Sequence, residues 1–399
     1  MLGICLQKPH VSFRLPISAA VVAWMALSAC QPAESELGRP SPAPAVGTTR
    51  IEIAGPDGGV MPVQLWYPAS QSTRAEAQQG HPTQEFEPVG PRRNLIQSLL
   101  DRSPPGCSSR VMHAAFDAPV LASGAPFPVV VYSHHLEGMR FALFSIAEGL
   151  AKRGFVVAAP DHVGRSLFDR TDNLMTADPI GLALRFRFDD MAVRSAQLRR
   201  VIDALFDPST PQLPDDLRGR LDTARLGMLG HSEGSGSAGV ATAADTRIKA
   251  GAYLSFPPAR AIEFLDVFGQ PTGAELRVPA LFMFGQEDGV TGTLGNEVIR
   301  QQFAAHPAPA YLVEVPEAGH WSFADDCGLI PDFADGCGRG KRIAAPNAAF
   351  NYLDSNKARA IAVRYVVDFF QSQLLGAPVQ ALGPQFPAAD ALVQSNARP

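Results

Sequence analysis

The stretch Ala224–Gly239 constrains the fold of this chain more than any other, because it predicts a strand, a sharp turn and a helix in succession. Its first part is apolar and leads into Gly230–Gly234, which reads GHSEG, and small residues follow at helical spacing. G-x-S-x-G at such a turn holds the serine at a helix N-terminus, where backbone N–H groups favour an anion. The stretch therefore predicts a nucleophile elbow at Ser232. The alternative interpretation is a glycine-rich turn without chemistry.

Buried apolar runs alternate with helical patterns along the rest of the chain. Nearly continuous apolar runs, typical of strands buried on both faces, cover residues 127–133, 154–159, 248–254, 278–285 and 310–315. Helical patterns cover residues 141–153, 189–206, 296–305 and 358–375. This alternation predicts a mostly parallel sheet with helices on both faces, preceded by an antiparallel hairpin over residues 50–67. Ligands of such sheets bind outside the carboxyl ends of the strands.

The composition fits a globular protein with a large core. The chain has 399 residues, of which 46% are hydrophobic and 18% charged, as expected for such a protein. Its net charge of -5 gives no basic footprint, which argues against a nucleic-acid partner. The 35 glycines and 35 prolines indicate long loops. We expect the insertions at residues 70–126, 164–184 and 256–277 to form a cap that shapes the substrate pocket.

The N-terminal segment has the features of an export signal. Basic residues precede an apolar run from Leu15 to Leu27, which is shorter than the roughly 20 residues that a spanning helix needs. The run ends in Leu27-Ser28-Ala29-Cys30, which resembles the lipobox of bacterial lipoproteins. The resemblance implies cleavage before Cys30, lipidation of its thiol and anchoring to a bacterial membrane. Gln31 in place of aspartate favours the outer membrane. The alternative is an ordinary signal peptide.

These features divide the chain into four parts. Residues 1–29 are the predicted signal peptide, and residues 30–47 are a disordered tether rich in Pro, Ala, Ser and Glu. Residues 48–376 form the predicted folded domain, and residues 377–399 are a C-terminal tail.

A serine nucleophile needs a histidine base, and the base needs a carboxylate that fixes its tautomer. After an elbow serine, the expected order along the chain is acid and then histidine. Asp288 follows the apolar run 278–285, and His320 follows the run 310–315. We therefore predict Ser232, Asp288 and His320 as the catalytic residues. Glu287 is the competing choice for the acid.

The oxyanion hole is expected to combine two backbone N–H groups. One belongs to Glu233, directly after the serine, and the other to Leu136, in the loop after the run 127–133. His135 and Trp321 are candidate side chains of the substrate pocket, and packing is the alternative role of Trp321. His134, His135 and His162 lack the spacing of metal ligands, so no metal site is predicted.

The mature chain keeps three cysteines besides the predicted lipidation site. Export places Cys107, Cys327 and Cys337 in surroundings that permit disulfides. Cys327 and Cys337 flank a short loop, which favours a disulfide between them. A pair between Cys107 and either of them is the alternative, and one thiol is then left over.

The segments together resemble the α/β-hydrolase fold. Within it, they are similar to the platelet-activating-factor acetylhydrolase-like and predicted dienelactone-hydrolase-like group. The resemblance rests on the elbow and on five further segments, which are 65–68 (LWYP), 131–134 (VYSH), 154–157 (GFVV), 160–162 (PDH) and 319–325 (GHWSFAD). It spans nearly the whole predicted mature chain. It implies ester hydrolysis by a Ser-Asp-His triad without a cofactor.

Two positions depart from that group. His135 stands where the group usually has glycine, which places a side chain near the predicted oxyanion hole. Plasma acetylhydrolase-like members place the acid after the strand that follows the elbow, and the matching residue here is Ser255. The acid is therefore expected at the later position, Asp288. True dienelactone hydrolases use a cysteine nucleophile, and Ser232 argues against their activity.

The sequence thus predicts a membrane-tethered serine esterase that acts on small acyl esters or lipid esters. A surface-binding lipoprotein that keeps the fold but hydrolyses nothing is the alternative from another class. A polyester hydrolase or peptidase that uses the same three residues is the third interpretation.

Overall fold

The computed structural model describes residues 43–170, 174–176, 180–181, 190–261, 269–383 and 390–396. Residues from Ala43 onward form one compact unit. The predicted signal peptide and Cys30 lie outside the described residues, as do parts of the insertions predicted at 164–184 and 256–277. None of the helices in the described ranges is long and apolar enough to cross a membrane.

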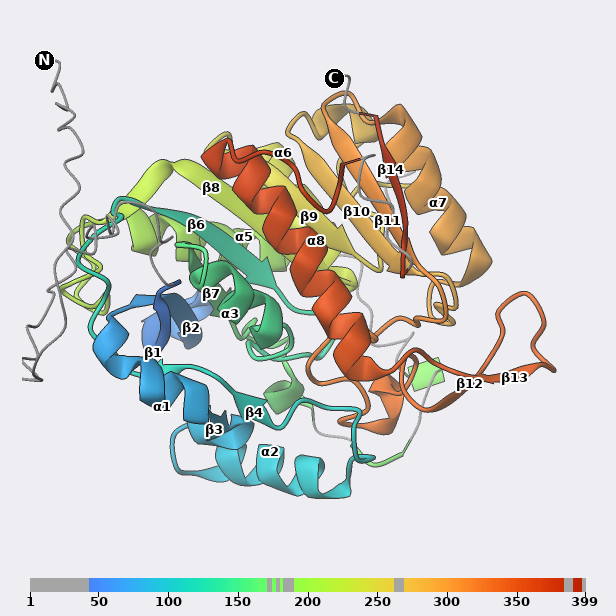
Figure 1. Cartoon of the computed structure of the whole chain (residues 1–399), viewed down its shortest axis with the longest axis horizontal. Helices are drawn as coiled ribbons and strands as arrows, with labels where there is room; N and C mark the ends of the chain where they lie inside the picture. Colours follow the sequence, from blue (N-terminus) through green and yellow to red (C-terminus); the bar gives the residue numbers. More distant parts are fainter. Residues whose placement is uncertain are drawn as a thin grey trace, which may run out of the picture. The chain divides into compact units, whose positions relative to one another are not determined.

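A twisted sheet forms the centre of this unit, with the strand order β14-β11-β10-β9-β8-β6-β7-β2-β1-β5 among the described residues (Figure 1). Strands β6 to β11 run parallel to one another, and β2 pairs in antiparallel fashion with both β1 and β7. The strands are β1 (Ala45–Ala54), β2 (Val60–Ala69), β5 (Ala115–Phe116), β6 (Phe127–Ser133), β7 (Val156–Pro160), β8 (Leu221–His231), β9 (Ile248–Leu254), β10 (Ala280–Gly285), β11 (Ala310–Val315) and β14 (Leu392–Ser395). Two small ribbons add β3 (His81–Pro82) with β4 (Val111–Met112), and β12 (Arg339–Lys341) with β13 (Ala349–Asn351).

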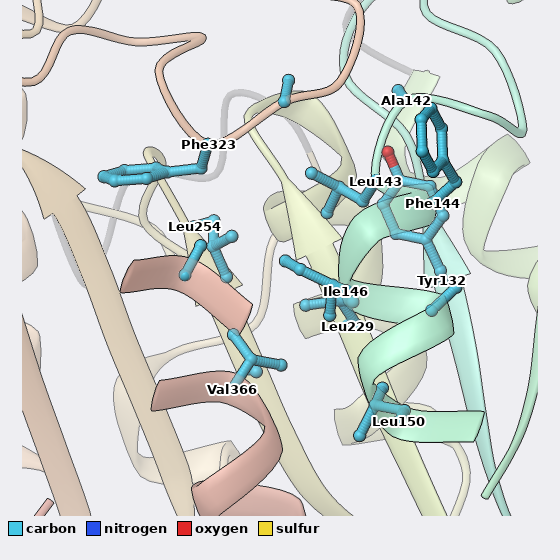
Figure 2. Packing of buried hydrophobic residues seen from close by; sticks show 14 of the residues in the cluster. Tyr132, Ala142, Leu143, Phe144, Ile146, Leu150, Leu229, Leu254, Phe323 and Val366 are labelled. Carbon is cyan, nitrogen blue, oxygen red and sulfur yellow. The ribbon is translucent and has the colours of Figure 1, made fainter. Parts of the chain in front are cut away.

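Helices cover both faces of the sheet because successive strand residues point to opposite faces. Val130 contributes to a core with the helices α3 (Phe144–Ala151) and α8 (Ser355–Leu375). Val129 and Val131 contribute to a second core with α5 (Asp190–Phe206), α6 (Glu233–Ala244) and α7 (Gly292–Ala305). Figure 2 shows the first core, where Ile146 and Leu150 of α3 and Val366 of α8 lie over the sheet. Two further helices of the described residues are α1 (Arg74–Gln79) and α2 (Pro91–Arg102).

The ends of the folded part lie outside the range 48–376 that the sequence predicted. Strand β1 starts at Ala45, inside the predicted tether, because β2 continues to Ala69 and offers a partner for those residues. Strand β14 lies in the predicted tail and pairs antiparallel with β11. It supplies hydrogen-bond partners to the backbone of β11, which would otherwise be an edge strand. A strand of four residues is too short for the sequence pattern to predict it.

The disulfide joins Cys107 and Cys337, whose Cα atoms lie 5.6 Å apart. The predicted Cys327–Cys337 pair is therefore wrong, and the alternative in which Cys107 takes part is confirmed. Cys327 is a free thiol that is fully buried in the core. The hydroxyl of Ser108 donates to the Cys327 carbonyl oxygen at 2.9 Å, so the segment after Cys107 lies against the loop that ends at Cys337. Contacts between distant segments, rather than the short spacing, decide the pairing.

Candidate active site

The elbow predicted from Ala224–Gly239 consists of β8, a turn at Ser232 and α6. Ser232 has φ 55° and ψ -128°, a strained conformation for a residue with a side chain. Its backbone N–H donates to the carbonyl oxygen of Leu254 at 2.8 Å, which ties the turn to the end of β9. A Cβ atom on Gly234 would lie 2.1 Å from the Ser133 carbonyl oxygen, so only glycine lets α6 approach β6 this closely.

The structure brings the three predicted catalytic residues together. The Ser232 hydroxyl lies 2.6 Å from Nε2 of His320, and Nδ1 of His320 lies 2.7 Å from Oδ2 of Asp288. His320 and Asp288 are fully buried, whereas Ser232 keeps 8% of its surface exposed. A histidine that donates from Nδ1 to a carboxylate presents an unprotonated Nε2 to the serine hydroxyl, which is the arrangement of a general base.

Asp288, and not Glu287, has the position of the orienting carboxylate. Its other oxygen, Oδ1, accepts from the backbone N–H groups of Val290 and Thr291 at 3.0 and 2.9 Å. These bonds hold the carboxylate in place beside the His320 ring. The Glu287 carboxylate is paired with Arg342 at 2.7 Å instead.

Two further residues position the histidine loop and were not singled out by sequence. Nε2 of His231 lies 2.8 Å from the His320 carbonyl oxygen and donates to it. Asp335 accepts from Gly289 N–H at 2.6 Å and from the Tyr352 hydroxyl at 2.7 Å, with His320 N–H at 3.4 Å. Burial, followed by repulsion from Asp288, raises the pKa of the Asp335 carboxyl. His231 could have been noticed as the second residue of G-x-S-x-G, but Asp335 lies in a loop without any motif.

The two N–H groups predicted for the oxyanion hole flank the serine. Glu233 is the first residue of α6, and Leu136 follows β6 in the loop beside it. Among the described residues, neither of these backbone N–H groups has a hydrogen-bond partner. They are therefore free to bind an oxygen atom of a substrate.

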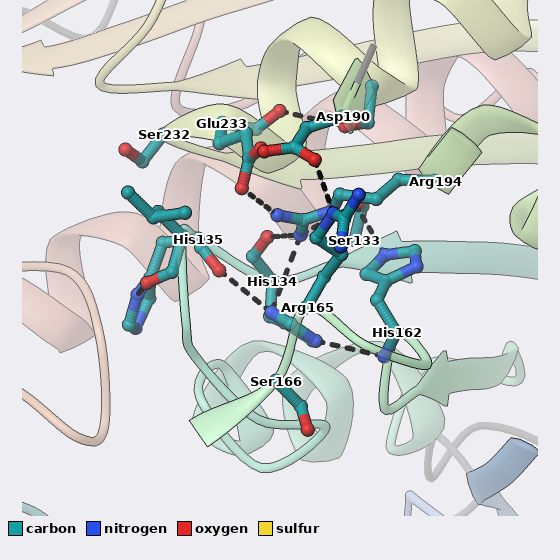
Figure 3. A network of polar contacts seen from close by, with 12 residues as sticks. Ser133, His134, His135, His162, Arg165, Ser166, Asp190, Arg194, Ser232 and Glu233 are labelled. Carbon is teal, nitrogen blue, oxygen red and sulfur yellow. Dashed lines mark hydrogen bonds and ion pairs between the residues drawn. The ribbon is translucent and has the colours of Figure 1, made fainter. Parts of the chain in front are cut away.

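The Glu233 side chain points away from the serine hydroxyl into a buried polar network, shown in Figure 3. It forms an ion pair with Arg194 of α5, and both side chains are fully buried. Arg194 also donates to the carbonyl oxygen of His134. Burial lowers the pKa of Arg194 and raises that of Glu233, while the attraction between them opposes both shifts. No sequence motif singles out Arg194, which lies within an ordinary helical pattern.

The candidate pocket residues His135 and Trp321 are both buried. Nε2 of His135 lies 3.0 Å from Oδ2 of Asp326, and its ring packs edge-on against Phe333. The Trp321 ring packs edge-on against His320, with the centroids 4.6 Å apart. The two side chains thus belong to an aromatic cluster beside the histidine loop, and their role in substrate binding stays a prediction.

Two sequence families match the chain. The model of the dienelactone hydrolase family matches residues 116–373, which is more than half of the chain. The model described as platelet-activating factor acetylhydrolase, isoform II, matches residues 43–172. Both belong to the group that the sequence motifs resemble.

The chain is also similar to solved structures. A ferulic acid esterase from Streptomyces cinnamoneus is 22% identical, covers 90% of this chain and 99% of its own, and superposes with a TM-score of 0.59. A putative dienelactone hydrolase from Klebsiella pneumoniae subsp. pneumoniae MGH 78578 is 16% identical, covers 82% of this chain and 98% of its own, and has a TM-score of 0.47. The α/β-hydrolase fold predicted from the sequence is confirmed by the sheet order and the first of these likenesses.

Proposed function

Because the chain belongs to the dienelactone hydrolase family and is a hydrolase that acts on esters, we propose that it is a serine esterase. Ser232 is the nucleophile, His320 the general base and Asp288 the orienting acid. The observation that carries this proposal is the unbroken series of contacts from the Ser232 hydroxyl through His320 to Asp288. A buried serine, histidine and carboxylate in this order have the geometry of nucleophilic acyl transfer.

The reaction follows from this geometry in two stages. Oγ of Ser232 adds to the ester carbonyl carbon while its proton passes to Nε2 of His320. The carbonyl oxygen becomes an oxyanion, and the two free N–H groups of Leu136 and Glu233 bind it. His320 then gives the proton to the leaving alcohol, and an acyl-enzyme remains on Ser232. Water, activated by His320 in the same way, releases the acid.

Asp288 stabilises the imidazolium that forms in each stage. Two backbone N–H groups and the histidine N–H donate to its carboxylate and hold it beside the ring. The substrate class that we propose is small acyl esters or lipid esters, with the acyl chain length set by loops around the serine.

The proposed nucleophile is tested by ester turnover in the Ser232→Ala variant. We expect turnover of p-nitrophenyl acetate to fall by roughly 10⁴-fold or more, because the covalent step is lost. Ser237→Ala is the matched control, since this serine lies on the same helix and its hydroxyl donates only to the Glu233 carbonyl oxygen, at 3.0 Å. Full activity in the folded Ser232→Ala variant would show that another residue carries the reaction.

We also propose that the protein is exported and anchored to a bacterial membrane, the outer membrane being favoured, by a lipid on Cys30. The lipobox-like run that ends at Cys30 supports this proposal. Cells that express the full chain should incorporate labelled fatty acid into it, and Cys30→Ser should abolish the incorporation. An unlabelled parent protein would contradict the anchor.

A further inference from the structure

Arg194 reaches two chain segments that flank Ser232 (Figure 3). One terminal nitrogen of its guanidinium donates to Oε2 of Glu233, the residue after the serine. The other donates to the carbonyl oxygen of His134, in the loop after β6. Because guanidinium donors form a rigid planar fork, both contacts can be made at once only when the two segments keep a fixed separation.

The contact to His134 fixes the loop that carries the Leu136 N–H. A trans peptide group is planar, so the His135 carbonyl oxygen and the Leu136 N–H point in opposite directions. That oxygen accepts from Gly138 N–H at 3.0 Å and from Nδ1 of His134 at 2.8 Å. Arg194 holds the peptide group just before it through the His134 carbonyl oxygen. Hydrogen bonds therefore fix the orientation of two successive peptide groups, and the second of them contains the Leu136 N–H.

Hydrogen bonds fix the tautomer of the His134 ring, so that Nδ1 carries the proton. Its Nε2 accepts from the backbone N–H of His162 at 3.2 Å, which leaves the proton on Nδ1 to donate to the His135 carbonyl oxygen. Burial, followed by repulsion from Arg194, lowers the pKa of His134 well below 6.5. The ring therefore stays neutral, and the tautomer persists at neutral pH.

The contact to Glu233 fixes the other side of the oxyanion site. The side chain of Glu233 anchors the first turn of α6, whose backbone N–H is the second proposed donor. An unpaired carboxylate on the residue next to Ser232 would repel a developing oxyanion. The paired guanidinium neutralises that charge, and full burial strengthens the effect because water does not screen it.

We infer that Arg194 is a positioning residue that aligns the two halves of the oxyanion hole through Glu233 and the His134 carbonyl oxygen. The inference rests on the proposed esterase function. A fully buried ion pair lies next to the nucleophile, although replacing such a pair by apolar residues of similar volume often leaves the stability of a protein unchanged or raises it. A positioning role accounts for its presence there.

Two variants test the inference without leaving a buried charge unpaired. Arg194→Lys keeps the positive charge but lacks the fork that spans both acceptors. The double variant Arg194→Met with Glu233→Met removes both charges at similar volume and is expected to fold. It leaves the backbone N–H of residue 233 in place, so only the anchoring of the donor is lost.

Three quantities are measured for each variant: kcat, KM and the inhibition constant of a transition-state mimic. We expect kcat for p-nitrophenyl acetate to fall by roughly 10- to 100-fold in both variants, with KM changed less than about twofold. A trifluoromethyl ketone forms a hemiketal when Oγ of Ser232 adds to its carbonyl, the serine proton moves to His320, and the carbonyl oxygen becomes an oxyanion. Its inhibition constant should rise by the same factor as kcat falls, because both depend on the hole.

Arg359→Lys is the matched control. This buried arginine of α8 also contacts a carboxylate, Asp325, and donates to a backbone carbonyl oxygen, that of Cys107 at 2.7 Å. Its replacement should lower the unfolding temperature while kcat and the inhibition constant stay at the parent values.

Two outcomes overturn the inference. In the first, the folded double variant keeps the parent kcat. In the second, kcat falls while the inhibition constant of the ketone does not rise. Ester turnover of the Arg194 variants is measured in parallel with that of Ser232→Ala. The comparison separates a failure of the proposed esterase function from a failure of the role inferred for Arg194. If turnover does not depend on Ser232, the proposed function fails and the inference fails with it. If it depends on Ser232 but not on Arg194, the inference alone fails.

Discussion

Single residues define the chemistry of the site: His320 links Ser232 to Asp288, and the ion pair of Arg194 with Glu233 lies beside them. Ser232, Asp288 and His320 could be predicted because each follows a recognisable strand and the order of the three is constrained. Arg194 and Asp335 could not, because their partners lie in segments far away in the chain. A charged residue within a helical pattern looks like a surface residue in the sequence. Its burial becomes apparent only when the structure shows its partner.

The role of Asp288 predicts a specific loss in Asp288→Asn. An amide that donates to Nδ1 would force the His320 proton onto Nε2, where it can no longer accept from the serine. We expect kcat to fall by roughly 10⁴-fold with the fold intact, as measured by ester turnover and circular dichroism. Glu287→Gln is the control, since Glu287 pairs with Arg342, and it should keep kcat within about twofold. A larger loss in Glu287→Gln than in Asp288→Asn would move the acid to Glu287.

Whole elements hold these residues through close backbone approaches. Periodicity predicted the central strands and most helices, because buried runs and helical spacing are local properties. It did not predict the start of β1 or the presence of β14, because short edge strands depend on a partner strand more than on their own residues. The elbow helix α6 was predicted from its small residues. In the structure these residues let the helix approach β6 and the segment after β9 closely.

Gly239 of α6 provides the element-scale prediction. A Cβ atom there would lie 2.0 Å from the Pro258 carbonyl oxygen, so Gly239→Ala forces α6 away from the segment after β9. We expect the free energy of unfolding to fall by about 1–3 kcal/mol, although alanine favours helices over glycine by about 1 kcal/mol. Urea unfolding measures this change.

Ala243→Gly is the control for that helix, because Ala243 is exposed and tests propensity alone. It should cost no more than about 1 kcal/mol. A gain of stability in Gly239→Ala would mean that α6 does not lie this close to Pro258.

At the scale of the whole molecule, stability depends on ionisable groups that folding removes from water. Glu148 of α3 is nearly fully buried, and burial raises its pKa from 4.5 to about 8, against smaller opposing effects of Lys152 and the His113 N–H. The folded chain therefore holds a proton that the unfolded chain releases above pH 4.5. The stability that the protonated group supports is complete below pH 4.5 and is lost as pH rises through 8.

Glu148→Gln should remove this pH dependence, since the amide oxygen can still accept from the His113 N–H. We expect the variant to become more stable than the parent by about 1.4 kcal/mol per pH unit between pH 5 and 8. Urea unfolding of both proteins at pH 5, 6, 7 and 8 measures the difference. A constant difference across that range would contradict a buried, protonated Glu148.

The central claim is that Ser232 is the nucleophile, and covalent labelling tests it most directly. The protein is treated with a fluorophosphonate, digested, and its peptides are mapped by mass spectrometry, with Ser232→Ala treated in parallel. The account predicts one adduct, on the Ser232 hydroxyl, that is absent from the variant and that removes ester turnover in proportion to its occupancy. An adduct on another residue, or full turnover after complete labelling of Ser232, would contradict it.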